Sequence, residues 1–263
     1  MPDLRARFPS SLMRVSTWTR LADGAVPVVV IRPEHPAVTP LPFLLWFHGR
    51  TVDKETDAGR YLRLVRAGIG CIAVDLPGHG ERPVASMQDG SRTAEVVEQA
   101  ASEIDGIMAD APAFGFDPSR AVVGGLSAGG MAAALRGCSP HPFSGFLLEA
   151  TTGDWSTLCG RPGFPASTVD RLNPITHLQG WRDCPVLALH ATLDAWVPVE
   201  GQRRFIAALQ ARSAHPDSIA LHEYARTDAP HEHMGFGRMA SDAKSRGTRF
   251  ISSCCRVELT DPA

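Results

Sequence analysis

The sequence contains very little lysine and no large excess of charge of either sign. Lys54 and Lys244 are its only lysines, and all its other basic residues are arginines scattered along the chain. The 26 basic residues are nearly balanced by 28 acidic ones, which gives a formal net charge of −2. Nucleic acids and anionic lipid surfaces attract proteins with a strong positive field. We therefore expect neither a nucleic acid nor a membrane among the partners of this protein.

Long apolar runs and regularly spaced cysteine pairs are also absent. No run approaches the roughly 18 residues of a membrane span, and the segment from Met1 to Ser11 lacks the apolar core of a signal peptide. None of the six cysteines forms a Cys-x-x-Cys pair, and Cys254 and Cys255 are adjacent. This pattern is typical of neither a zinc knuckle nor a disulfide framework. We expect a cytoplasmic protein with reduced thiols and no bound metal.

The composition is that of an ordinary globular protein. Of the 263 residues, 44% are hydrophobic and 21% are charged, so the chain has enough apolar surface to build a large core. Chains of this length often form one α/β domain. Because the sequence has no repeat and no long linker, we expect residues 1–263 to form a single domain, present as a monomer or a homodimer.

Short apolar runs alternate with helical patterns along most of the chain. Two strands with a turn at Asp23-Gly24 are predicted within residues 11–32, and further strands at 42–47, 70–74, 120–123, 146–148, 185–190 and 219–224. Helices are predicted at 56–67, 91–109, 199–211 and 238–254, and an Ala-rich helix follows the glycines at 124–130 and runs to about residue 136. Continuous apolar runs are typical of strands buried on both faces. The pattern predicts an α/β fold, a three-layer α/β/α sandwich with a mostly parallel twisted sheet.

Residues 154–183 interrupt this alternation. The segment lies between the fourth and fifth core strands, and it is rich in Trp, Pro and Gly. It is too short to be a domain. We interpret it as a short cap over the carboxyl edge of the sheet, where open α/β folds bind their ligands.

The strongest motif is Gly125-Leu126-Ser127-Ala128-Gly129, a G-x-S-x-G sequence between a β-branched strand and an Ala-rich helix. In this context a sharp, strained turn lifts the serine hydroxyl clear of the sheet. Larger side chains two residues to either side would collide with the neighbouring strand and helix, so glycine is required there. The motif predicts a nucleophilic serine; the alternative is a glycine-rich turn that only packs the helix against the strand.

The same glycines do not match a nucleotide-binding loop. Gly124 and Gly129 have the spacing of a phosphate-binding loop, but Gly130 and Met131 follow where Lys and Ser or Thr are needed. No three of the glycines have the spacing of the dinucleotide-binding motif. We therefore expect no nucleotide cofactor.

A serine nucleophile needs a base, and the base needs a carboxylate partner. On this fold the expected chain order is Ser, then Asp or Glu, then His. Asp194 follows a core strand and is the predicted acid, with Glu149 as the alternative. His231 and His233, in the loop after the last strand, are both candidates for the base, and position alone does not separate them. A metal-binding H-E-x-x-H motif is excluded because Gly235 stands where its second His is required.

Acyl transfer also needs hydrogen-bond donors for the developing oxyanion. The backbone N–H groups of Ala128, directly after the nucleophile, and of Arg50, in the loop after residues 43–47, are the predicted donors. Gly49 would let that loop approach Ser127. We expect His48 to be structural, hydrogen-bonded beneath the site. Asp75 and His79, in a tight loop at the same edge, are expected to organise turns.

Taken together, these motifs resemble the α/β-hydrolase fold family over about residues 14–254. The resemblance depends on His48-Gly49, Asp75 with Pro77-Gly78-His79-Gly80, the G-x-S-x-G motif, Asp194 with Val197-Pro198, and the His231 loop. Within the family, the chain looks like the small esterases related to dienelactone hydrolase and the prolyl oligopeptidase group. The resemblance implies a Ser–His–Asp triad. In such proteins the base often stands in a Gly-x-x-His or an x-x-His-Glu loop. His231-Glu232 matches the second of these sequences, which favours His231 over His233.

Two residues depart from the pattern of the family. Ala191 stands where glycine is usual, which is a mild change. Arg50 stands where the family often has a small or aromatic residue. Its backbone N–H can still donate, but its side chain could favour acidic substrates or pair with Glu55 or Asp53. Ser127 argues against the haloalkane dehalogenases and epoxide hydrolases of this fold, which carry Asp at the nucleophile position.

The expected function is therefore hydrolysis of carboxylic esters without a cofactor. Ser127 attacks, His231 moves the proton, Asp194 orients His231, and the amides of Arg50 and Ala128 hold the oxyanion. Apolar residues of the cap, namely Trp155, Leu158 and Phe164, suggest a small acyl pocket and hence short-chain esters. The alternatives are a thioesterase, a dienelactone-type hydrolase or a ligand-binding protein on a hydrolase fold. A peptidase is disfavoured because the chain has no added propeller domain.

Overall fold

The computed structural model describes residues 7–34, 36 and 38–258. No signal peptide was expected in the segment from Met1 to Ser11. Residues 1–6 of this segment lie outside the described residues. The fold is built on one eight-stranded sheet of order β1-β2-β4-β3-β5-β6-β7-β8. The strands are β1 (Ser16–Leu21), β2 (Val26–Ile31), β3 (Leu41–Phe47), β4 (Gly70–Val74), β5 (Phe116–Leu126), β6 (Gly145–Glu149), β7 (Val186–Ala191) and β8 (Ile219–Tyr224).

Most neighbouring strands in the sheet run parallel. β4, β3, β5, β6, β7 and β8 pair in parallel, whereas β1 and β2 form an antiparallel hairpin and β2 joins β4 antiparallel. Every residue of β2, β3, β4 and β6 is buried, because helices cover both faces. The predicted mostly parallel α/β sandwich is thus confirmed.

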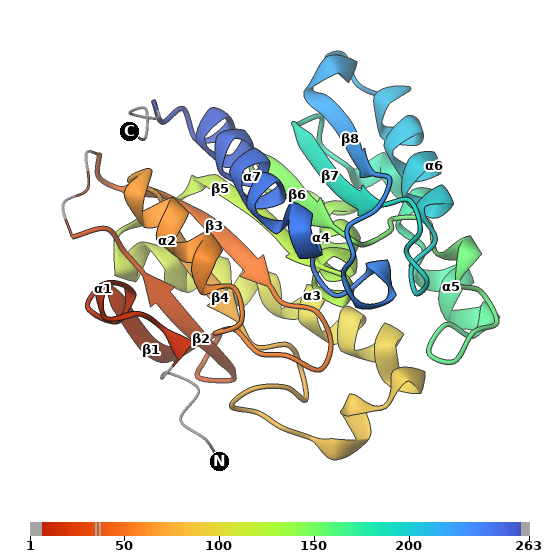
Figure 1. Ribbon diagram of the computed structural model, residues 1–263, viewed down its shortest axis with the longest axis horizontal. Coiled ribbons are helices and arrows are strands. Elements are labelled where there is room, and N and C mark those ends of the chain that lie inside the picture. The colour runs from red at the N-terminus through yellow and green to blue at the C-terminus, as the bar shows by residue number, and fades with distance from the viewer. Residues whose placement is uncertain (1–6, 35, 37, 259–263) are drawn as a thin grey trace.

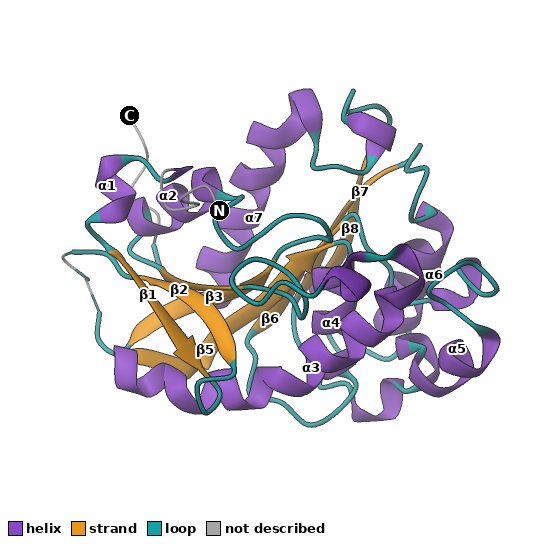
Figure 2. Ribbon diagram, turned by 90° about the horizontal axis from the view of Figure 1, so that it is seen from below, coloured by secondary structure: helices purple, strands orange, loops and turns teal. Residues whose placement is uncertain are grey.

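The described part of the chain has seven α-helices, and six of them form two layers on the faces of the sheet. They are α1 (Ser10–Met13), α2 (Ala58–Arg66), α3 (Thr93–Asp110), α4 (Ala128–Gly137), α5 (Ala166–Leu172), α6 (Val199–Gln210) and α7 (Ala240–Cys254). Figure 2 shows α1, α2 and α7 on one face and α3, α4 and α6 on the other. Alternate side chains of each strand enter the two cores: Phe43 and Leu45 pack with α3 and α4, and Leu44 and Trp46 with α2 and α7.

Two details differ from the elements predicted from the sequence. Residues 11–13 belong to the short helix α1 rather than to a strand, because the Pro9 carbonyl accepts the amides of Leu12 and Met13. β5 extends from Phe116 to Leu126, well beyond the apolar run at 120–123. Its additional residues at the carboxyl end lead directly into the G-x-S-x-G turn.

The segment 154–183 contains α5 and three short 3₁₀ turns, at 155–157, 174–176 and 178–180. In Figure 1, α5 lies at one end of the sheet, beside α6. Among the described residues, no helix is both long enough and apolar enough to cross a membrane.

Candidate active site

Ser127 occupies the sharp turn between β5 and α4. Its backbone has φ +53° and ψ −119°, a conformation that typically costs a non-glycine residue about 1–3 kcal/mol. Hydrogen bonds on both sides hold the turn: the Ser127 amide donates to the Glu149 carbonyl at 2.9 Å, and the Thr151 hydroxyl donates to the Ser127 carbonyl at 2.7 Å. The neighbouring strand β6 and the residues that follow it thus stabilise the strained turn.

The two glycines of the motif are required by close backbone contacts. A Cβ atom on Gly125 would lie 2.4 Å from the carbonyl carbon of Gly129 and 2.6 Å from the Phe47 oxygen. On Gly129 it would lie 2.3 Å from the same Phe47 oxygen. Real Cβ atoms essentially never come this close. The collision predicted from the motif is therefore present, and it arises mainly from the end of β3 and from the turn itself.

Ser127, His233 and Asp194 form a hydrogen-bonded chain. His233 Nδ1 lies 2.7 Å from Asp194 Oδ2, and His233 Nε2 lies 2.8 Å from the Ser127 hydroxyl. Because the ionised carboxylate can only accept, Nδ1 carries the proton and Nε2 accepts the hydrogen bond from the serine. This is the tautomer that a histidine needs in order to act as a general base towards serine.

His231, the histidine preferred from the sequence, is not in this chain. Its exposed ring stacks on Trp196 with centroids 4.9 Å apart. The backbone explains the difference, because His231 and Glu232 both have positive φ angles, +55° and +52°. The turn directs His231 to the surface and places His233 in the buried site. The assignment of His231 is therefore corrected to His233.

Glu232 maintains this turn, a role that the sequence analysis did not identify. Its carboxylate accepts the Thr227 amide at 2.6 Å, the Thr227 hydroxyl at 2.7 Å and the Asp228 amide at 2.9 Å. These hydrogen bonds lower the pKa of Glu232. The sequence feature that could have indicated this role is a Glu that follows a Thr-Asp pair by four to five residues within a polar loop.

Asp194 is held as an anion at the carboxyl end of β7. Its Oδ1 accepts the amides of Trp196 at 2.9 Å and Val197 at 2.8 Å, while Oδ2 faces His233 and lies 3.4 Å from His190 Nε2. Burial alone would raise the pKa of Asp194, but the hydrogen bonds from His190 and His233, the charge of His233 and the Val197 amide outweigh it and lower the pKa to about 2.

Glu149, the alternative acid, has a different partner. It lies at the end of β6 and forms an ion pair with Arg60 on α2, whose Nη2 donates to both carboxylate oxygens, at 2.8 and 2.7 Å. Arg60 also pairs with Asp57 at 2.7 Å and lies over the Trp46 ring. The Glu149 carboxylate is therefore part of a buried charge network below the site.

The loop after β3 runs close to Ser127. A Cβ atom on Gly49 would be in ordinary contact with the Ser127 Cβ, at 3.6 Å, so the adjacent Arg50 amide belongs to the wall of the site. Ala128 is the first residue of α4, where helix amides have no partner within the helix. The two predicted oxyanion donors thus belong to two separate segments adjacent to Ser127.

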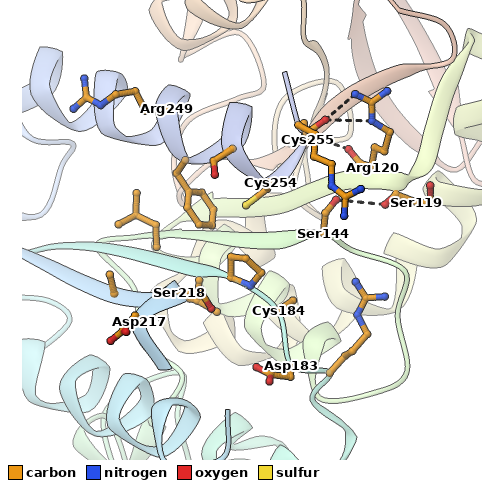
Figure 3. Close-up of a pocket in the computed structure, with 18 residues that line it drawn as sticks. Ser119, Arg120, Ser144, Asp183, Cys184, Asp217, Ser218, Arg249, Cys254 and Cys255 are labelled. Carbon is orange, nitrogen blue, oxygen red and sulfur yellow. Dashed lines mark hydrogen bonds between the residues drawn. The ribbon is translucent and has the colours of Figure 1, made fainter. Parts of the chain in front are cut away.

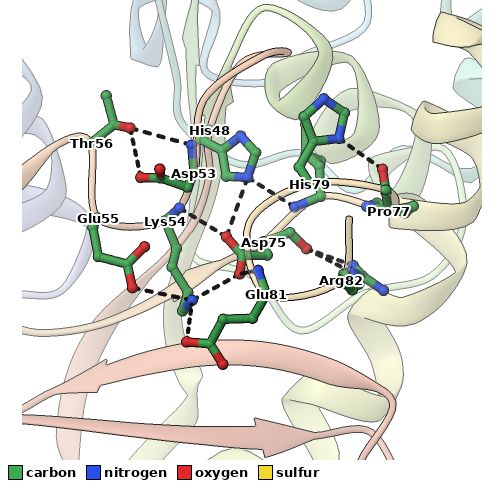
Figure 4. Close-up of polar contacts among 12 residues, drawn as sticks. His48, Asp53, Lys54, Glu55, Thr56, Asp75, Pro77, His79, Glu81 and Arg82 are labelled. Carbon is green, nitrogen blue, oxygen red and sulfur yellow. Dashed lines mark hydrogen bonds and ion pairs between the residues drawn. The ribbon is translucent and has the colours of Figure 1, made fainter. Parts of the chain in front are cut away.

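His48 and Asp75 support this loop from below, as predicted (Figure 4). His48 Nδ1 donates to the Gly49 carbonyl at 2.6 Å, and Nε2 accepts the Leu76 amide at 3.0 Å. Burial is the main reason that the pKa of His48 falls to about 4. His48 is thus a neutral structural residue. His79 Nδ1 likewise bonds its own turn, at the Pro77 carbonyl.

The sequence analysis missed the role of Lys54, one of the two lysines. It is 1% exposed, and its ammonium lies 2.8 Å from Asp75, 3.0 Å from Glu81 and 3.2 Å from Glu55. Burial opposes the charge of Lys54, but these carboxylates outweigh it and raise the pKa. Asp75 also accepts the Lys54 amide, so the pair ties the loop after β3 to the loop after β4.

A cavity of about 660 Å³ opens beside Ser127 and His233. Its walls come from the loop after β3, the start of α3, the His233 loop and α7, and from the predicted cap through Leu158, Arg161, Pro162 and Phe164. Trp155 is fully buried and packs edge-on against Phe164. Two of the three expected pocket residues therefore line the cavity, and Trp155 belongs to the core.

A second hollow, of about 1030 Å³, lies at the opposite edge of the sheet (Figure 3). Residues around the amino ends of β6, β7 and β8 and the end of α7 line it, among them Arg120, Cys184 and Cys254. Burial raises the pKa of both thiols to about 12, so neither is a reactive nucleophile. Among residues 7–34, 36 and 38–258, no three His, Cys, Asp or Glu side chains are grouped as metal ligands.

Comparisons with known proteins agree with this geometry. A model of the alpha/beta hydrolase family matches residues 43–251, and a search of curated proteins found no match. Among solved structures, a Thermus thermophilus protein has a TM-score of 0.70 and 22% identity, covering 92% of this chain and 98% of that one. A Klebsiella pneumoniae protein, described as a candidate dienelactone hydrolase, has a TM-score of 0.69 and 18% identity over 90% and 98%.

A longer relative in the solved structures is a peptidase. The Mycobacterium tuberculosis puromycin-hydrolyzing peptidase has a TM-score of 0.73 and 20% identity, and the match covers 94% of this chain but only 40% of the peptidase. At these identities the likeness shows the fold. Because the family model covers well over half of the sequence, the chain belongs to the alpha/beta hydrolase family, which makes it a hydrolase.

Proposed function

We propose that this protein is a serine hydrolase that cleaves carboxylic esters, with Ser127 as nucleophile, His233 as general base and Asp194 as its partner. The hydrogen-bonded chain from Ser127 through His233 to Asp194 is the observation that supports the proposal most directly. A serine hydroxyl is a weak nucleophile at neutral pH, and this arrangement supplies the base and the carboxylate that activate it.

The proposed reaction has two halves. In the first, His233 Nε2 takes the proton of Ser127 as the hydroxyl oxygen attacks the ester carbonyl, and the amides of Arg50 and Ala128 stabilise the oxyanion. The protonated His233 then gives its proton to the leaving alcohol. In the second half, His233 takes a proton from a water as its oxygen attacks the carbonyl carbon of the acyl–serine ester. The bond from that carbon to the serine oxygen then breaks, and His233 returns the proton to Ser127 as the acid leaves. Asp194 stabilises the charge on His233 in both halves.

The cavity supports small substrates. Its volume lies within the range typical of small-molecule sites, and Leu158 and Phe164 give part of its wall an apolar surface. We propose esters of short acyl chains as the substrate class. Peptides are a weaker proposal, because this chain spans only 40% of the peptidase that it resembles.

The test is hydrolysis of p-nitrophenyl acetate, butyrate and octanoate by the wild type and by Ser127→Ala. We expect rates that fall with chain length and that disappear in the variant. Labelling of Ser127 by a fluorophosphonate would separate an enzyme from a ligand-binding protein. Activity that survives in Ser127→Ala, or a wild type that neither turns over these esters nor reacts with the probe, would contradict the proposal.

A further inference from the structure

The charges in the wall of the cavity are not balanced. Two carboxylates line it, and both are already paired: Glu149 with Arg60 at 2.7 Å, and Asp57 with Arg60 at 2.7 Å and Lys244 at 3.3 Å. Two further cations, Arg50 and Arg161, line the same cavity, and no carboxylate of the described residues lies within the 4.0 Å of an ion pair from either. The charge of the exposed Asp89 carboxylate acts on Arg50 only from beyond the distance of an ion pair. The cavity therefore has positive charge that the chain itself neutralises only in part.

Arg50 is held firmly at this wall. Its Nη2 donates to the carbonyls of Gln88 at 2.5 Å and Asp89 at 2.8 Å, so the side chain bridges from the loop after β3 to the turn before α3. Two hydrogen bonds to the backbone fix the plane of the guanidinium and use both hydrogens of Nη2. The hydrogens of Nη1 remain, and they can donate a charge-assisted hydrogen bond to a carboxylate.

The unpaired Nη1 of Arg50 is the second observation. Arg50 Nη1 is buried and has no hydrogen-bond partner among the described residues. Buried donors are nearly always satisfied, because leaving one unpaired is costly. The Arg161 guanidinium, in contrast, is exposed to solvent and donates to the Trp196 carbonyl at 3.0 Å. Arg60 Nη1 in the same wall also has no hydrogen-bond partner among the described residues, but Arg60 already pairs with Asp57 and Glu149. Arg50 is therefore the cation in this wall that has a buried, unpaired donor and no ion pair among the described residues.

We propose that Arg50 binds a carboxylate of the substrate, so that the enzyme prefers esters that carry a free carboxylate close to the scissile bond. This inference rests on the proposed function, in which the backbone amide of the same residue is an oxyanion donor. The carboxylate would accept a hydrogen bond from Arg50 Nη1, the nitrogen that has no partner. Hydrolysis of such an ester by water gives an alcohol and an acid, and the recognised carboxylate is unchanged.

The test compares esters that differ only by the carboxylate. Mono-p-nitrophenyl glutarate is paired with p-nitrophenyl valerate, in which a methyl group replaces the acyl-side carboxylate. In a second pair, 4-carboxyphenyl butyrate and phenyl butyrate, the charge is on the leaving group. We expect kcat/KM to be about 10–100-fold higher for the charged member of one pair, the range expected of a charge-assisted hydrogen bond. The pair that shows the preference identifies the side on which the carboxylate lies.

Variants connect the preference to Arg50. Arg50→Gln is expected to bring the ratio of the two kcat/KM values to about 1. Arg50→Lys is expected to leave it intermediate, because lysine keeps the charge but not the planar guanidinium that is fixed by the backbone. Arg203→Gln removes the same charge from exposed α6, where Arg203 pairs with Glu223 and Glu200, and is expected to keep the full ratio. Thermal unfolding of each variant checks that it is folded.

Two results would overturn the inference: a ratio near or below 1 in both pairs of esters, or a preference that survives Arg50→Gln. Failure of the proposed function looks different, because then valerate and butyrate esters are not cleaved, or Ser127→Ala cleaves them equally well. In that case a binding measurement tests the role of Arg50 without the need for turnover. Calorimetric titration of Ser127→Ala is expected to show tighter binding of glutarate than of valerate, and the difference is expected to be lost in Ser127→Ala/Arg50→Gln. Equal binding of the two acids would reject the role of Arg50.

Discussion

Replacing His233 by alanine is expected to remove nearly all esterase activity. The change deletes the imidazole that lies 2.8 Å from the Ser127 hydroxyl and 2.7 Å from the Asp194 carboxylate, so the serine has no base and the carboxylate has no partner. Losing the histidine of such a triad lowers kcat by roughly 10⁴–10⁶-fold. At 1.36 kcal/mol for each factor of ten, the barrier rises by about 5–8 kcal/mol.

His231→Ala is the matched control, because it removes the same side chain two residues earlier. His231 is exposed and stacks on Trp196, a contact worth about 0.5–1.5 kcal/mol beyond its buried area. We therefore expect at most about a tenfold loss of activity, even if the movement of Trp196 disturbs the adjacent His233 ring. Initial rates on p-nitrophenyl butyrate are expected to differ between the two variants by about three orders of magnitude or more. A larger loss in His231→Ala than in His233→Ala would refute the argument from the geometry.

Two further predictions concern the residues that hold His233. Because the pKa of Asp194 falls from 3.8 to about 2 on folding, its ionised form stabilises the folded state above pH 3.8 by about 2 kcal/mol, and this is lost as the pH falls towards 2. Urea unfolding of the wild type against Asp194→Asn should show the difference in stability shrink between pH 6 and pH 3 by roughly half of that value; a constant difference would show that Asp194 is not held as an anion. Glu232→Gln places amide hydrogens against the amide of Asp228 and should therefore misplace His233. We expect kcat to fall by about 10–100-fold, with a smaller change in KM. An unchanged kcat would show that the turn does not depend on this carboxylate.

Much of the fold could be predicted from the sequence because its signals are local. Strands buried on both faces appear as unbroken apolar runs, and each predicted core run lies within or overlaps a strand of the sheet. The G-x-S-x-G turn is also a local signal, since Gly125 and Gly129 are required by contacts within a few residues and with the end of β3. The chain order of Ser127 and Asp194 then followed from the topology of the sheet.

The parts that could not be predicted depend on contacts between distant residues. The ammonium of Lys54 is buried among three carboxylates, two of them on the loop after β4, and a single lysine before a helical pattern gives no sign of that environment. The unpaired Nη1 of Arg50 is a second feature that depends on distant residues. The sequence shows an arginine beside the nucleophile loop, but its missing partner is visible only when Gln88, Asp89 and the paired carboxylates of the cavity are placed around it.

The choice between His231 and His233 depends on the backbone rather than on residue type. Both residues are histidines in the same loop, and both can reach the carboxyl edge of the sheet. Positive φ angles at His231 and Glu232 reverse the chain between them, and neither residue is a glycine that would announce such a turn. The three hydrogen bonds of the Glu232 carboxylate stabilise this conformation. The residue that made His231 resemble the base of related enzymes is therefore also the residue that turns His231 away and brings His233 to Ser127.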